Sequence, residues 1–148
     1  MYRSPEETGG PWARPSAMEA SLALDGDGSR IAQGRHLAAV FLAGVRDMRG
    51  VPVVTATVEI VQLIVSELVT NARKYAPGPA LLNLRIADSV LQVELCDSNP
   101  SVPAAEEPDA ARIGRHGLEI VSALAQSVTV QATSTGKSIT AVVSLGEI

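Results

Sequence analysis

Apolar residues alternate with polar ones in several short segments of the chain, and this pattern predicts β-strands. The clearest segments are 81–87 and 90–96, which predict an antiparallel pair covered on one face. Three further segments are expected to be strands: 19–24, then a final hairpin of 128–133 and 138–145 that turns at 134–137. Most of the strands should therefore lie in the second half of the chain.

Elsewhere the apolar residues recur at a helical spacing. One helix is predicted from the N-cap Ser29 to about Met48, where Gly50 ends it. A second is predicted over roughly 55–75, and a third over 114–125. The apolar residues that carry the first two patterns are Ile31, Leu37, Val40, Phe41 and Val45, then Val58, Val61, Leu63, Ile64, Val65, Leu68 and Val69.

The predicted order is strand, two helices, two strands, helix, two strands, which favours an α+β two-layer sandwich. Residues 1–17 are rich in Pro, Gly and charge and are expected to form a flexible tail, with a single domain over 18–148. Trp12 lies in that tail, either partly exposed or docked on a partner subunit. Hydrophobic residues make up 46% of the chain and aromatic residues only 3%, so the core should be aliphatic.

Charge and cysteine content limit the expected partners and cellular compartment of the protein. The net charge is −4 and the basic residues are scattered, which argues against nucleic acid as the main partner. The single cysteine, Cys96, cannot form an internal disulfide, which favours a reducing compartment. The most apolar region, 51–69, is interrupted by polar residues, and the N-terminus has no apolar signal segment. We therefore expect a cytoplasmic protein with no membrane partner.

Three groups of residues could carry chemistry. Glu67, Asn71 and Lys74 are spaced by four and three, so they project from one face of the second helix. Alone, such a stripe is more often a solvated helix face. Asp97 follows an apolar strand, where ligand contacts are common, although alone it is also a turn former.

The third group is the glycine-containing start of the third predicted helix. Gly114 and Gly117 flank Arg115 there, and Leu118 follows. Glycines at the start of a helix let backbone N–H groups approach an anion, and the helix dipole favours the negative charge. This segment is a candidate phosphate cradle, although glycines begin many helices.

Taken together, the three groups resemble the boxes of the GHKL superfamily, also known as the Bergerat fold. The segment ELVTNARKYA, 67–76, fits its N box throughout, Asp97 fits its Asp box, and Gly114 to Leu118 fit its G-x-G-L box with one extra residue. A final small box matches weakly at 136–138. The resemblance covers about 19–146 and implies a mixed, mostly antiparallel sheet covered on one face by about three helices.

The resemblance also implies a ligand and a role for each residue. It implies ATP with Mg²⁺ held by the side-chain oxygen of Asn71, Glu67 as the group that orients or deprotonates the attacking hydroxyl, and Asp97 as the acceptor of the adenine amino hydrogen. The other nucleotide contacts it implies are Lys74, Gly114, Arg115, Gly117, Leu118 and Ser138. Segment 98–113 would be the lid over the nucleotide.

Within the superfamily, the chain looks like the stand-alone anti-sigma factor kinase branch. The phrase SELVTNA and the following D-S-x-P box are typical of that branch, and 148 residues leave no room for a transducer domain or a phosphoacceptor hairpin. The implied function is a protein serine/threonine kinase that binds a sigma factor and phosphorylates its antagonist, with a homodimer also allowed. Because the usual glycines after the Asp box are absent, two alternatives stay open: a nucleotide-binding protein that captures a partner without phosphorylating it, and an interaction module with a vestigial pocket.

Overall fold

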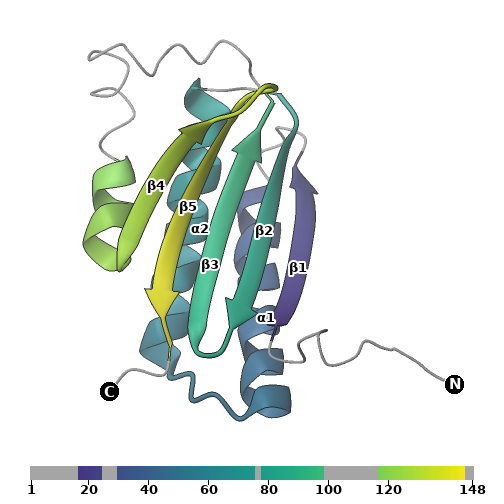
Figure 1. Ribbon diagram of the computed structural model, residues 1–148, viewed down its shortest axis with the longest axis vertical. Helices are drawn as coiled ribbons and strands as arrows, with labels where there is room; N and C mark the ends of the chain where they lie inside the picture. The colour runs from purple at the N-terminus through teal and green to yellow at the C-terminus, as the bar shows by residue number, and fades with distance from the viewer. Residues whose placement is uncertain (1–16, 25–29, 76–77, 99–116, 146–148) are drawn as a thin grey trace, which may run out of the picture.

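The computed structural model describes residues 17–24, 30–75, 78–98 and 117–145. They form a two-layer α+β sandwich in which helices cover one face of a five-stranded sheet (Figure 1). The strands are β1 (Ala17–Leu24), β2 (Ala80–Ala87), β3 (Val90–Asp97), β4 (Ser127–Ala132) and β5 (Lys137–Ser144). The labelled helices are α1 (Arg30–Arg49) and α2 (Thr55–Tyr75), and residues 117–124 form a third helical segment.

The sheet has the strand order β1-β2-β3-β5-β4, and all four neighbouring pairs are antiparallel. The fold class predicted from the sequence is confirmed, and the sheet is antiparallel throughout rather than mixed. The predicted flexible tail and the predicted lid fall outside the described residues, apart from Ala17, which begins β1, and Ser98. No helix in the described ranges is both long enough and apolar enough to cross a membrane.

The core lies between the sheet and the helices, because alternate strand residues point toward them. Leu82, Leu84 and Ile86 of β2 are at most 1% exposed, and β3 and β5 contribute their own alternating apolar residues. α1 and α2 pack closely at Gly34, where an added Cβ would lie 2.9 Å from Val65 Cγ1. The apolar pattern of the helices overstates the core, since Val40 is 54% exposed and Leu63 is 42% exposed.

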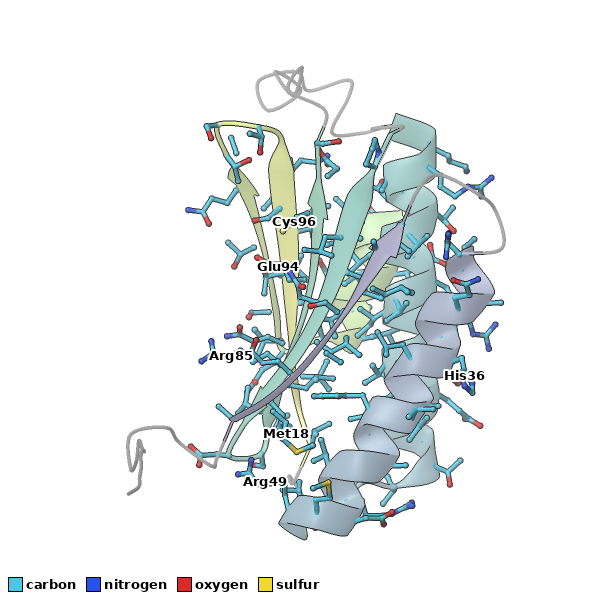
Figure 2. All side chains as sticks on the ribbon, turned by 90° about the vertical axis from the view of Figure 1, so that its right-hand side faces the viewer. Met18, His36, Arg49, Arg85, Glu94 and Cys96 are labelled. Atoms are coloured by element: carbon cyan, nitrogen blue, oxygen red, sulfur yellow. The ribbon has the colours of Figure 1, made fainter. Side chains whose placement is uncertain are left out.

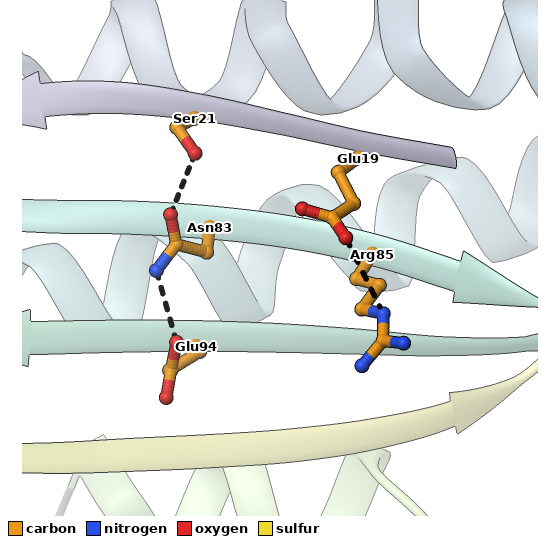
Figure 3. A network of polar contacts seen from close by, with 5 residues as sticks. All are labelled: Glu19, Ser21, Asn83, Arg85 and Glu94. Atoms are coloured by element: carbon orange, nitrogen blue, oxygen red, sulfur yellow. Dashed lines mark hydrogen bonds and ion pairs between the residues drawn. The ribbon is translucent and has the colours of Figure 1, made fainter. Parts of the chain in front are cut away.

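Within the described ranges, no helix lies on the opposite face of the sheet, which is largely polar, as Figure 2 shows for Arg85 and Glu94. A chain of hydrogen bonds crosses three strands there (Figure 3): Ser21 Oγ donates to Asn83 Oδ1 at 2.7 Å, and Asn83 Nδ2 donates to Glu94 Oε1 at 2.9 Å. An ion pair joins Arg85 to Glu19 nearby. The candidate chemistry must therefore be sought on the helical face and at the strand ends.

Candidate functional site

The polar stripe on α2 leads from the interior to solvent. The helix spans Thr55–Tyr75, as predicted, so Glu67, Asn71 and Lys74 share one side of it. Asn71 is only 7% exposed, Glu67 is half-buried and Lys74 is exposed. A buried amide costs free energy unless it is hydrogen-bonded, whereas a solvated helix face would leave all three side chains in water. The burial of Asn71 therefore favours a site over a plain solvated face.

Glu67 faces the third helical segment at Gly117. A Cβ added to Gly117 would lie 3.0 Å from Glu67 Oε1 and 3.9 Å from the Glu67 carbonyl oxygen. Such a contact is tighter than most real Cβ contacts, so the absence of a side chain lets the segment approach the carboxylate. Leu118, the next residue, packs against the core and anchors the segment. Glu67 of the α2 stripe and Gly117 of the glycine-containing segment are thus brought together.

Asp97 is the last residue of β3, and its side chain is 3% exposed. The register of the sheet places it directly opposite Lys137, the first residue of β5, on the helix-covered face. Lys137 Nζ lies 2.6 Å from Asp97 Oδ2, and the Lys137 side chain is 17% exposed. A buried carboxylate is costly unless it is paired, and Lys137 supplies the opposite charge.

Gly136 makes the close approach of the two strand ends possible. An added Cβ at this position would lie 2.1 Å from the Asp97 carbonyl oxygen and 2.9 Å from Asp97 Oδ1. Only a residue without a side chain fits against this backbone. Figure 1 shows that β3 ends and β5 begins at the same end of the sheet, where α2 also reaches its C-terminus.

Lys137 is the residue of this site that sequence reasoning missed. The predicted hairpin placed Lys137 in the turn and began the last strand at Ser138, whereas β5 begins at Lys137. Ser138, predicted to contact nucleotide, lies opposite Cys96 in the register and therefore on the face of the sheet away from Asp97. The sequence did contain a signal for this residue. If the last strand is extended by one residue to begin directly after Gly136, Lys137 can be aligned with Asp97.

The sequence from residue 31 to residue 143 matches a family model described as the histidine kinase-like ATPase domain. The match covers well over half of the chain. The chain belongs to this family. The resemblance to the GHKL superfamily found in the sequence is thereby confirmed, and ATP binding is the family's general property.

The fold of this histidine kinase-like ATPase domain is also found among solved structures. One similar chain is in the crystal structure of the RsbU and RsbW domains of Rv1364c from Mycobacterium tuberculosis, with a TM-score of 0.62 and 15% sequence identity. The similarity covers 88% of this chain and 33% of that one, so the present chain spans about a third of its neighbour's length. No curated protein matches the sequence.

Asn71 has the chemistry that a nucleotide-bound Mg²⁺ would require. Within the described ranges, no three His, Cys, Asp or Glu side chains cluster as a metal site. Asn71 is a buried oxygen donor, and Mg²⁺ in nucleotide sites is commonly held by one or two such protein ligands together with phosphate oxygens and waters. Gly114 and Arg115, the other residues of the predicted cradle, lie outside the described residues.

Cys96 borders the site but faces the other side of the sheet. Burial raises the pKa of the Cys96 thiol, and the neighbouring carboxylate of Glu94 raises it further, with a smaller contribution from Asp97. The thiol therefore stays protonated at neutral pH, and a protonated thiol is a poor nucleophile and a poor metal ligand. This agrees with a structural role for Cys96.

Proposed function

We propose that this chain is an ATP-dependent protein serine/threonine kinase of the anti-sigma factor type, which binds a sigma factor and phosphorylates its antagonist. Membership of the family supports ATP as the nucleotide, and the sequence segment SELVTNA supports the anti-sigma factor kinase branch. The likeness in fold to a chain that contains an RsbW domain is in keeping with it. On this proposal the protein works in the cytoplasm with protein partners, as a monomer or a homodimer.

The observation that carries the proposal is the position of Glu67. Its carboxylate lies beside Gly117, and Glu67 stands one helical turn before the buried Asn71 on α2. When bound, Mg·ATP supplies the phosphoryl group and the charge that neutralises it. Asn71 would hold the cation, and Glu67 would orient the attacking serine or threonine hydroxyl and accept its proton. Asp97 would accept a hydrogen bond from the base.

The remaining contacts are proposed from the resemblance and from their places in the fold. Lys74 is exposed at the end of α2, where it could reach a phosphate. Gly117 and Leu118 would offer backbone N–H groups to the phosphates, together with Gly114 and Arg115. Ser138 is a weaker candidate, because its side chain points to the helix-free face.

Replacing Glu67 by alanine tests the catalytic role. Glu67→Ala should leave nucleotide affinity nearly unchanged and reduce phosphoryl transfer by about 100-fold or more, as expected for loss of a positioned general base. The assay is transfer of labelled γ-phosphate from ATP to a candidate antagonist protein. Glu59→Ala is the matched control, because Glu59 is an exposed glutamate two turns earlier on α2. Equal transfer rates in wild type and Glu67→Ala would refute the assignment.

Replacing Asp97 by asparagine tests the base contact. Asp97→Asn should weaken ATP binding by roughly 1–3 kcal/mol, because a charge-assisted hydrogen bond is lost. Isothermal titration calorimetry measures the change. Asp88→Asn is the control, since Asp88 is exposed in the β2–β3 turn at φ 59°, a conformation that asparagine tolerates. An unchanged affinity for Asp97→Asn would show that the base binds elsewhere.

A second candidate function is partner capture by a nucleotide-bound protein without phosphorylation. The ion pair between Asp97 and Lys137 favours it, because a base must share the carboxylate with the ammonium group. In that case the titration would show nucleotide binding, the antagonist would bind, and no labelled phosphate would be transferred under any condition. Transfer of phosphate to a serine or threonine of the antagonist decides for the kinase.

A further inference from the structure

The ion pair at the strand ends changes what the proposed base contact can recognise. An ionised carboxylate only accepts hydrogen bonds, whereas an ammonium group only donates them and has three hydrogens. Asp97 and Lys137 sit side by side, with Nζ 2.6 Å from Oδ2, so an acceptor and a donor occupy neighbouring positions. Their interaction uses one of the three ammonium hydrogens, which leaves two for another acceptor.

A carboxylate alone discriminates sharply between purines. It accepts a hydrogen bond from a 6-amino group, but a 6-oxo group turns an acceptor toward it and leaves both without a donor. With Lys137 beside the carboxylate, the 6-oxo group has a donor, and the N1–H of the same base can donate to Asp97. For a 6-aminopurine the amino group donates to Asp97 directly, so its recognition does not need a bond from Lys137.

We propose that Lys137 is a specificity-determining residue that widens recognition at Asp97 from adenine nucleotides to purine nucleotides with either a 6-amino or a 6-oxo group. This inference rests on the proposed nucleotide site. The pair is part of a defined structure rather than a loose surface contact. The Asp97 side chain is 3% exposed, the two residues are opposite each other in the β3–β5 register, and Gly136 lets the strand ends approach closely.

The position of the pair favours a role in ligand recognition as well as in stability. Leu95 lies two residues before Asp97 on β3, and Ile139 lies two residues after Lys137 on β5. Both are in the core and are 2% exposed. The pair continues this row on the helix-covered face at the end of the sheet, where the strands stop and the apolar row ends. The Lys137 side chain is 17% exposed against 3% for that of Asp97, so the pair meets solvent on the lysine side.

The experiment compares ATP with inosine triphosphate in the presence of Mg²⁺, by calorimetry on the full chain. Inosine triphosphate has the 6-oxo group without the 2-amino group of guanine, so only the edge facing the pair differs. For the wild type we expect dissociation constants within roughly tenfold of each other. In Lys137→Met the ratio of the two constants should shift by about 10- to 100-fold in favour of ATP, because the 6-oxo group loses its donor.

Two further variants separate recognition from stability. Lys137→Arg keeps a cationic donor and should retain the wild-type ratio, and Arg85→Met removes a strand cation on the opposite face and should leave both constants unchanged. The inference is overturned if the wild type binds ATP more than 100-fold more tightly than inosine triphosphate, and this result does not depend on whether Lys137→Met folds. It is also overturned if Lys137→Met folds and the ratio of the two dissociation constants is unchanged. Binding of ATP without inosine triphosphate leaves the proposed function standing, whereas binding of neither overturns both.

Discussion

Gly136 offers the sharpest test of how the site is built. Its absent side chain lets β3 and β5 meet, because an added Cβ would lie 2.1 Å from the Asp97 carbonyl oxygen, 2.8 Å from the Asp97 carbonyl carbon and 2.9 Å from Asp97 Oδ1. Two of these atoms belong to the backbone and cannot rotate away. Gly136→Ala must therefore push the strand ends apart by at least about 1.3 Å to restore ordinary van der Waals separation.

The cost of that displacement follows from the contacts it would disturb. Overpacking a tight site costs about 1–3 kcal/mol, and weakening the neighbouring ladder and turn hydrogen bonds adds about 1 kcal/mol. One such bond joins Thr133 N to Gly136 O at 2.8 Å. We expect Gly136→Ala to lower the free energy of unfolding by about 3 kcal/mol, which at a urea m-value of about 2 kcal/mol/M lowers the midpoint by about 1.5 M.

The matched control is another glycine-to-alanine change with the opposite expected sign. Gly44 lies inside α1, and an added Cβ would find only Met18 Cε, at 4.0 Å. Because alanine is the better helix former, Gly44→Ala should raise the free energy of unfolding by about 0.5–1 kcal/mol. Urea titration followed by circular dichroism measures both. If Gly136→Ala unfolds at the same urea concentration as wild type or a higher one, the proposed close approach is wrong.

Three more predictions concern the helix-free face. Glu94→Gln should lower the pKa of Cys96 and speed its alkylation by iodoacetamide at pH 8, because a carboxylate that opposes the thiolate is removed. Because the pKa of Cys96 is raised in the folded state, its contribution to stability is fully present below the unfolded-state pKa and is lost as the pH rises through the folded-state pKa. Urea titrations at pH 7 and pH 10 should show this loss of stability in the wild type. A Cys96→Ala variant should not show it. Ser21→Ala should lower stability by no more than about 1 kcal/mol in the same assay, because the bond that Ser21 donates to Asn83 is solvent-exposed.

Local signals were enough to predict the elements of the fold. The 3.6-residue period and the flanking prolines located α2, which spans the predicted Thr55–Tyr75, and Gly50 ends α1 as expected, with φ 71° and its N–H bonded to the Arg46 carbonyl. Which apolar side chains enter the core was less predictable. Val40 and Leu63 fit the helical pattern but remain exposed, because the core-facing side of a helix is set by the sheet it covers.

The site was predictable only to the extent that its geometry is local. The spacing of Glu67 and Asn71 along one helix follows from the helical repeat, so the sequence could place them on one side of α2. The meeting of Asp97 with Lys137 joins residues forty positions apart through the register of two strands. The predicted strand began at Ser138, one residue after the observed start of β5 at Lys137, so the sequence did not anticipate that Lys137 pairs with Asp97.

The same pair couples stability to recognition, and this decides how variants of Asp97 must be interpreted. Removing its charge leaves the Lys137 ammonium group without its buried partner, which can destabilise the protein by several kcal/mol whether or not a nucleotide binds there. Gly136→Ala displaces both groups but keeps their chemistry. If Asp97 acts on the base, Asp97→Asn should lose more nucleotide affinity than a Gly136→Ala variant of similar residual stability. If Asp97 only holds β3 to β5, the two variants should lose affinity in proportion to their loss of folding.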